Sequence, residues 1–394
     1  MGYRKFQSDQ LFTGYELLNG GYVVITDDQG EIEDIVQEQD AGDNIQKFRG
    51  LISPGFINCH CHLELSHLKN VIPPHTGLIE FLCSVVTKRS FDAKTIQDEI
   101  VKGEIEMHEN GIVAVGDIGN TADTVEVKSK SEIRWHNFVE ILGFTDEKAE
   151  ENVAHYHSVL DTFNKIRNPK SEIRNSLVPH APYSISPKTF KLINELTKNQ
   201  TISVHNQEHP AEDELYKTGG GEYLKLFKLF GVNQSPFPVT GKSSVRSYLP
   251  YFDHGQTIFL VHNTYMPEED IVWANEYAVE HGLKLIYCLC PNANLYIENR
   301  LPPIALFIKH RCTLVLGTDS YSSNWQLSIA KEIQGLTTMA HFERVASLQT
   351  ALQWATINGA TALQWDDDLG SFEKGKTPGV VVIDTTNWTS RRLI

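Results

Sequence analysis

Eight apolar runs, most of them unbroken stretches of valine, isoleucine and leucine, recur through the middle of the chain. Segments with helical periodicity lie between them, for instance 93–110, 187–198, 267–281 and 302–310. Strands that are buried on both faces of a parallel sheet have this pattern, and eight strand-helix units fit a (β/α)8 TIM-like barrel. The sequence therefore predicts an α/β fold with barrel strands at 56–62, 112–117, 135–142, 176–180, 201–205, 257–262, 284–290 and 313–319.

The two ends of the chain have a different pattern, in which short apolar runs alternate with turn residues. Asn19-Gly20-Gly21 and the stretch 27–30 are typical of hairpin turns, and the stretch 370–379 leads into a strand at 380–384. A barrel of about 250 residues with a small appendage accounts for the length of 394 residues. We predict that 55–365 form the barrel, and that 1–54 and 366–394 form one small β-sandwich built from both termini.

The charge balance argues against one class of partner. The chain has 35 basic and 50 acidic residues, a formal net charge of −15, whereas nucleic-acid binding is dominated by cationic contacts. No run of about 18 apolar residues occurs, and no apolar h-region follows the polar first residues. We therefore expect a cytoplasmic protein with a small-molecule substrate and with neither a nucleic acid nor a membrane as partner.

Side chains that can bind a metal stand where the apolar runs end, and the C-terminal strand ends of a barrel are where its active site lies. Five of the eight runs end in this way, with His60 and His62, His180, His205, His262, and Asp319.

The pair His60 and His62 belongs to an H-x-H motif on a strand. Strand side chains alternate with a period of two, so both imidazoles point to the same face and can reach one ion. The pair alone is a weak signal. Its combination with His205, with Glu208 three residues later, and with Asp319 at the end of a VLGTD run predicts a metal site.

Six motifs near these strand ends resemble the amidohydrolase superfamily, in the branch that holds the chlorohydrolases and the aromatic-base aminohydrolases. The resemblance spans nearly the whole chain. The motifs are PGFINCHCH at 54–62, PHAPYSIS at 179–186, HNQE at 205–208, LVHN at 260–263, CPNAN at 290–294 and GTDSYSSN at 317–324.

The resemblance implies one divalent metal ion, commonly zinc, with iron as the alternative. Its ligands would be His60, His62, His205 and Asp319. Glu208 looks like the proton shuttle of this branch, and His262 like the group that polarises the bound water. Binuclear relatives use a carboxylated lysine at the end of the fourth strand, where this chain reads LVPH without a lysine.

The chemistry of such a site favours hydrolytic deamination. A divalent cation lowers the pKa of bound water from about 15.7 to about 7, which makes hydroxide available at neutral pH. Asp319 would orient that water, His262 would stabilise the charged oxygen, and Glu208 would pass a proton to a ring nitrogen and to the leaving amine. We predict an aminohydrolase that releases ammonia from an aminated heteroaromatic ring, a purine base or a purine nucleoside derivative. HNQE and GTDSYSSN look most like bacterial aminodeoxyfutalosine deaminases, which makes 6-aminodeoxyfutalosine one such substrate.

Three further residues are predicted to contact the substrate. His180 belongs to the PHAPYS element, although a histidine at a strand end is also found in structural roles. Glu64 follows the H-x-H pair, where a solvated loop carboxylate is an equal interpretation. Arg246, with Lys242 nearby, lies between the fifth and sixth runs, where a surface ion pair explains a cation equally well.

Several alternatives stay open on sequence alone. The same metal site serves cyclic amide hydrolysis, as in imidazolonepropionase, and dehalogenation, as in the chlorohydrolases. A catalytically silent scaffold is a third hypothesis, but it predicts a broken ligand set, which this chain does not have. Relatives are often dimers, so a homodimer is also open.

Overall fold

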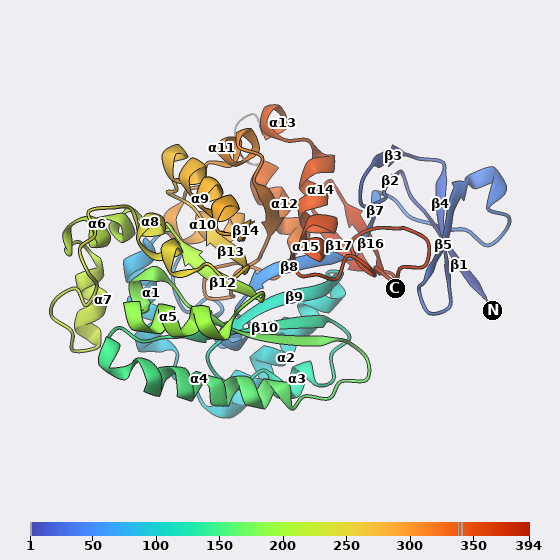
Figure 1. Cartoon of the computed structure of the whole chain (residues 1–394). Helices are drawn as coiled ribbons and strands as arrows, with labels where there is room; N and C mark the ends of the chain where they lie inside the picture. The colour runs from blue at the N-terminus through green and yellow to red at the C-terminus, as the bar shows by residue number, and fades with distance from the viewer. Residues whose placement is uncertain (1, 338, 340–341) are drawn as a thin grey trace.

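The computed structural model describes residues 2–337, 339 and 342–394. Figure 1 shows a larger part made of helices and strands and, at one end, a smaller part made of strands that includes both termini. Within the described residues, no helix has the length and the apolar character that crossing a membrane requires.

All eight predicted barrel strands are present, which confirms an α/β fold with parallel sheets. They form two four-stranded parallel sheets, ordered β8-β9-β10-β11 and β12-β13-β14-β15, so that each strand neighbours the next one in sequence. Their bounds are β8 (Phe56–Cys61), β9 (Ile112–Gly119), β10 (Arg134–Ile141), β11 (Ile173–Pro179), β12 (Thr201–Asn206), β13 (Thr257–His262), β14 (Lys284–Leu289) and β15 (Thr313–Leu316).

The predicted closed ring of eight strands is not observed in the hydrogen-bond ladders. No ladder joins β11 to β12 in the described residues, and a bond from the His205 N–H to the His180 carbonyl links them (3.1 Å). β8 and β15 are joined by one isolated bridge between Cys61 and Asp319. The ladder is short there because β15 already ends at Leu316, three residues before the predicted end.

Helices connect the strands and pack around the two sheets (Figure 1). The four helices named above from their periodicity are α2, α5, α9 and α11. Pro187 is the first residue of α5, where its missing N–H costs no helical bond. The bounds are α1 (Leu78–Lys88), α2 (Ala93–Glu109), α3 (Val125–Lys128), α4 (Ala149–Asn164), α5 (Pro187–Leu196), α6 (Pro210–Thr218), α7 (Tyr223–Leu229), α8 (Ser244–Tyr248), α9 (Glu268–Glu280), α10 (Pro291–Glu298), α11 (Ile304–Lys309), α12 (Ile329–Thr337), α13 (Phe342–Val345), α14 (Leu348–Ala355) and α15 (Ile357–Ala362).

The terminal strands form two sheets, ordered β5-β4-β1-β6 and β17-β16-β7-β2-β3. Strand β16 pairs antiparallel with β7, so the two ends of the chain share a sheet, as predicted. Apolar residues of both sheets, such as Phe6 and Ile52, belong to one buried cluster. The bounds are β1 (Tyr3–Gln7), β2 (Gln10–Phe12), β3 (Leu17–Asn19), β4 (Tyr22–Asp27), β5 (Ile32–Gln37), β6 (Gln46–Lys47), β7 (Leu51–Pro54), β16 (Val380–Asp384) and β17 (Thr389–Arg392).

One of the two predicted hairpin turns is confirmed and the other is wrong. The stretch 27–30 joins β4 to β5, which pair antiparallel, and Gly30 takes the positive φ of 89° that such turns favour. Asn19-Gly20-Gly21 joins β3 to β4, but these strands lie in different sheets. The turn signal there marks a change of sheet, because a sequence shows that the chain turns and not which strand it meets next.

Candidate metal centre

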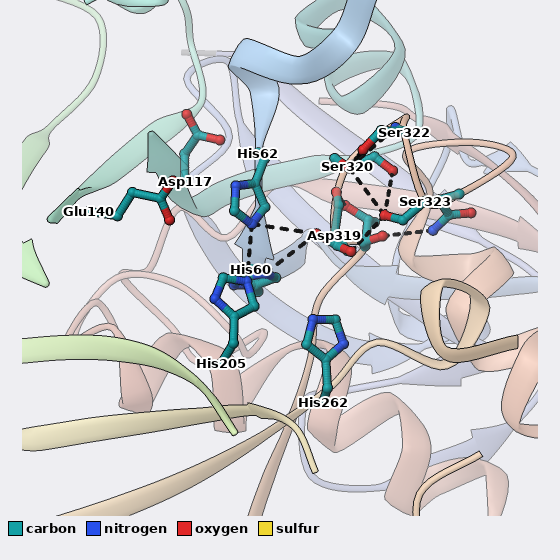
Figure 2. Close-up of polar contacts among 12 residues, drawn as sticks. His60, His62, Asp117, Glu140, His205, His262, Asp319, Ser320, Ser322 and Ser323 are labelled. Carbon is teal, nitrogen blue, oxygen red and sulfur yellow. Dashed lines mark hydrogen bonds and ion pairs between the residues drawn. The ribbon is translucent and has the colours of Figure 1, made fainter. Parts of the chain in front are cut away.

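Four histidines and one aspartate from four strand ends point toward a common centre (Figure 2). The Nε2 atoms of His62 and His205 are 3.3 Å apart. Oδ1 of Asp319 lies 3.5 Å from Nε2 of His60 and 3.5 Å from Nε2 of His62. His262 belongs to the same cluster, since its ligand-type atom lies within 4.8 Å of those of His60 and Asp319.

These separations fit one metal ion. Two ligand atoms about 2.0–2.2 Å from a zinc ion at tetrahedral angles are about 3.3–3.6 Å apart. Both ring nitrogens of the fully buried His60 lack a hydrogen-bond partner in the described residues, although buried polar atoms are nearly always paired. The donor set of imidazoles and one carboxylate therefore fits a divalent cation.

Hydrogen bonds set the tautomers of two histidines. Nδ1 of His205 lies 2.7 Å from the His180 carbonyl oxygen, so Nδ1 carries the proton and Nε2 keeps its lone pair toward His62. His262 has the opposite arrangement. The Asn294 amide donates to Nδ1 of His262 (3.4 Å), which leaves the proton of the neutral ring on Nε2. His205 is therefore prepared as a ligand, and His262 as a hydrogen-bond donor.

Burial controls the charge of this cluster. Burial lowers the pKa of His60, His62, His205 and His262, and the neighbouring histidines add to the effect, which favours the neutral form of these rings. Neutral imidazole is the form that binds metal. Burial opposes the ionisation of Asp319, but His62, His262 and the Ser323 hydroxyl outweigh it and lower the pKa of this carboxyl.

Asp319 reaches the cluster because the chain turns onto β8 immediately after β15. The N–H groups of Thr318 and Asp319 both donate to the His60 carbonyl, at 3.0 and 2.9 Å. Asp319 has a positive φ of 56°, an unfavourable conformation that costs about 1–3 kcal/mol. Gly317 permits the close approach, since a Cβ there would lie 2.7 Å from Cβ of His60 and 2.9 Å from its backbone nitrogen and oxygen.

A Gly317→Ala variant should therefore be less stable by about 1–3 kcal/mol and should bind metal more weakly. The added methyl group must push the end of β15 away from His60, and this moves Asp319 away from His60. Denaturant unfolding of the chelated protein and a metal titration measure the two effects. Gly220→Ala is the matched control, because the nearest atom to its Cβ is a flexible hydroxyl at 3.3 Å. If both variants had the same stability and the same metal affinity, the close approach of Gly317 to His60 would not matter for the cluster.

Glu208 lies beside the cluster, two residues beyond β12. It is buried, and its Oε1 is 3.7 Å from Nε2 of His262. Burial raises the pKa of Glu208 well above its usual range, and the charge of Asp319 adds to this. A carboxyl group that holds a proton so readily beside a reactive centre is suited to proton transfer.

A cavity of about 290 Å³ opens onto this centre. One wall is polar, with His62, His180, His205, His262, Glu208 and Asp319. The other is largely apolar and comes from α1, α7 and the chain after β10, with Leu78, Phe81, Leu82, Phe144, Leu226 and Phe230. Such a pairing of an apolar wall with a few convergent polar groups is typical of small-molecule sites.

Two of the three predicted substrate contacts line this cavity. His180 does, with Nδ1 2.8 Å from the Ser184 hydroxyl, and burial lowers the pKa of this ring to about 4. Glu64 also does, but it accepts hydrogen bonds from the N–H groups of Asn120 and Thr121, both at 3.0 Å. Burial raises the pKa of Glu64 to about 7.

The third predicted contact, Arg246, is not among the described residues that line this cavity. Its Nε donates to Asp270 (2.6 Å), and its guanidinium lies over the Trp273 ring. Lys242 lines the same surface groove as Arg246 and Asp270. The ion-pair interpretation of Arg246 is therefore the one that the geometry favours.

Two carboxylates near the centre escaped the sequence interpretation. Asp117, in β9, accepts a hydrogen bond from the N–H of Leu63 (2.8 Å), the residue that follows His62. It also forms a buried ion pair with Lys128. Glu140, in β10, lines the cavity. Both are polar residues near the ends of predicted apolar runs, so the rule that selected His205 and Asp319 would also have selected them.

The chain belongs to the amidohydrolase family, whose model matches residues 51–392. It is therefore a hydrolase, and the family uses a divalent metal ion.

Among its relatives, 5-methylthioadenosine/S-adenosylhomocysteine deaminase of Thermoanaerobacter pseudethanolicus is 27% identical over 366 residues, 90% of this chain and 77% of the relative. Aminodeoxyfutalosine deaminase of Nitratiruptor sp. is 26% identical over 347 residues, 85% of this chain and 79% of the relative. The crystal structure of Helicobacter pylori aminofutalosine deaminase with methylthio-coformycin has a TM-score of 0.78 at 22% identity, covering 96% of this chain and 92% of that chain. This likeness in structure extends over nearly the whole fold.

Proposed function

We propose that this protein is a metal-dependent aminohydrolase that releases ammonia from an aminated purine nucleoside or base. The observation that carries the proposal is the buried Glu208 beside His262 and the metal-type cluster, within one cavity. Deamination requires a group that moves protons to a ring nitrogen and to an amine at the same centre. The names of the two relatives support the substrate class, since both are deaminases of adenosine derivatives.

His60, His62, His205 and Asp319 are the residues we propose as metal ligands. His262 is left out because its Nε2 carries the proton of the neutral ring. Three imidazoles and a carboxylate suit both zinc and ferrous iron, and we propose zinc because the 3.3 and 3.5 Å separations fit the usual zinc–ligand distances, with water in a fifth position. When bound, the cation supplies water that is acidic enough to ionise near neutral pH.

The chain's own residues would carry the remaining steps. Oδ2 of Asp319 accepts a bond from the Ser323 hydroxyl (2.6 Å), which fixes the orientation of the carboxylate. Glu208 takes one proton from the attacking water and delivers it to the ring nitrogen. It then takes the proton of the hydroxyl group just added to the ring carbon and passes it to the amine, which leaves as ammonia while the C=O forms. The Nε2–H of His262 donates to the oxygen on which charge accumulates. The apolar wall from α1 and α7 limits the access of bulk water.

We also infer how the two sheets close. The two sheets meet at two places, between β11 and β12 and between β15 and β8. A backbone bond from His205 to His180 spans the first, and the bridge between Cys61 and Asp319 spans the second. These contacts support one eight-stranded barrel formed by residues 55–365. The apolar cluster shared by the two terminal sheets supports a β-sandwich of 1–54 and 366–394. The likeness to the H. pylori enzyme extends over nearly the whole fold, which supports a single common architecture.

Ammonia release tests the function directly. We expect the zinc-loaded protein to release one equivalent of ammonia from at least one member of a panel of adenosine, 5′-methylthioadenosine, 6-aminodeoxyfutalosine, adenine and guanine, and the chelated protein to release none. 6-Aminodeoxyfutalosine is the member that the HNQE and GTDSYSSN motifs favour. Imidazolonepropionate and chloro-substituted rings test cyclic amide hydrolysis and dehalogenation. Turnover of these alone, or of nothing, contradicts deamination.

A further inference from the structure

Glu140, in β10, lies against the centre without a role in the steps above. Glu140 is 3% exposed, and its side chain lines the cavity. Oε1 accepts a bond from the Asn120 amide (2.7 Å). Oε2 is buried and has no donor among the described residues. A buried carboxylate oxygen without a donor is unfavourable, so the site is arranged for a ligand that brings a donor.

The position of Glu140 relative to the centre defines which part of a substrate it meets. Ligand-type atoms of Glu140, His180 and His205 lie within 4.8 Å of one another, on the side of β10, β11 and β12. Glu208 lies with His262 of β13. In Figure 2, Glu140 lies on one side of His205 and His262 on the other. A ring whose amine and adjacent nitrogen face Glu208 therefore turns a different edge or substituent toward Glu140.

An adenine-type ring that carries a sugar has no N–H apart from the leaving amine, because its remaining ring nitrogens are all acceptors. These nitrogens cannot donate to a carboxylate. The donors that such a substrate offers away from the amine are the hydroxyl groups of its sugar. We propose that Glu140 accepts a hydrogen bond from a sugar hydroxyl and thereby selects an aminated purine nucleoside over the free base. This inference rests on the proposed deamination and names the substrate class of the same site.

A second metal ion held by Glu140, His180 and His205 is the competing interpretation, and the contacts disfavour it. Nδ1 of His205 is bonded to the His180 carbonyl, and its Nε2 faces His62 in the main cluster. His205 therefore has no nitrogen left for another ion. Nδ1 of His180 is engaged by the Ser184 hydroxyl.

The experiment combines changes in the enzyme with changes in the substrate. Wild type, Glu140→Ala, Glu140→Gln and Leu82→Ala are assayed for kcat and KM with adenosine, 2′-deoxyadenosine, 3′-deoxyadenosine and adenine, and the bound zinc is counted for each protein. If adenosine is not turned over, the best nucleoside of the ammonia panel and its two deoxy analogues replace it. Leu82 is the control, since it lines the apolar wall of the same cavity.

We expect wild type to prefer the nucleoside over adenine and over one deoxy analogue by about 10-fold in kcat/KM, the range of one hydrogen bond to the substrate. Glu140→Ala should lose most of this preference, by becoming slower on the nucleoside and staying unchanged on that deoxy analogue. Glu140→Gln, whose amide oxygen still accepts, should lie between the two. Leu82→Ala should slow all nucleosides by a similar factor.

Three results overturn the inference while the proposed function stands. In the first, the free base is the best substrate of wild type. In the second, Glu140→Ala loses kcat/KM by the same factor on all substrates. In the third, wild type binds two zinc ions and Glu140→Ala binds one. A merely structural Glu140 gives the second result. Release of no ammonia by wild type from any aminated ring overturns the proposed function itself, and the assignment of Glu140 falls with it.

Discussion

An Asp319→Ala variant should lose stoichiometric metal and at least about three orders of magnitude in kcat/KM. Asp319 contributes the one carboxylate of the cluster, with Oδ1 3.5 Å from Nε2 of both His60 and His62. A bound cation contributes several kcal/mol of charge stabilisation, and about 1.4 kcal/mol corresponds to a factor of ten in rate. Zinc analysis after gel filtration and the ammonia assay measure the two losses.

Ser323→Ala provides the graded comparison. It removes the 2.6 Å bond to Oδ2 of Asp319 and keeps the carboxylate itself. Loss of such an outer partner typically weakens metal affinity by about 10- to 100-fold, so excess zinc should restore its activity. Asp319→Ala should stay inactive at the same zinc concentration. An Asp319→Ala protein that keeps one zinc ion and normal turnover would show that the cluster is not the catalytic centre.

The residues of this centre were predictable from sequence because two geometric rules act locally. The alternation of side chains places His60 and His62 on one face of β8, and parallel strands carry their C-terminal residues to one edge. These rules need only the strand positions, and the apolar runs supplied those. The strand-end rule also made His205, His262 and Asp319 candidates, and the resemblance to the amidohydrolase superfamily then supplied the ligand set and the role of His262.

What escaped prediction depends on contacts between distant segments. The ladder gap between β8 and β15 depends on where β15 ends, next to the close approach of Gly317 to His60. Arg246 pairs with Asp270, a choice that no local pattern encodes. The apolar wall comes from α1 and α7, whose apolar faces the sequence cannot assign to the cavity or to a neighbouring helix.

Glu208→Gln should lower kcat for deamination by about 10²- to 10⁴-fold while zinc content stays at one equivalent. Glutamine keeps the shape of the side chain but cannot carry the proton, and Glu208 is not among the proposed ligands. Glu212→Gln is the matched control. Glu212 is also buried and has a pKa that burial raises to about 8, but its Oε1 accepts the Gln207 N–H and it does not line the cavity. Its kcat should stay within about threefold of wild type.

The leaving group separates a proton shuttle from a residue that only shapes the site. An amine must be protonated before it leaves, whereas chloride leaves without a proton. Glu208→Gln should therefore be impaired less on the 6-chloro analogue of the best purine nucleoside than on the amine itself, by about tenfold or more. A residue that merely positions His262, 3.7 Å away, slows both substrates by the same factor. Equal losses would assign the proton steps to another group and leave Glu208 a structural neighbour of the centre.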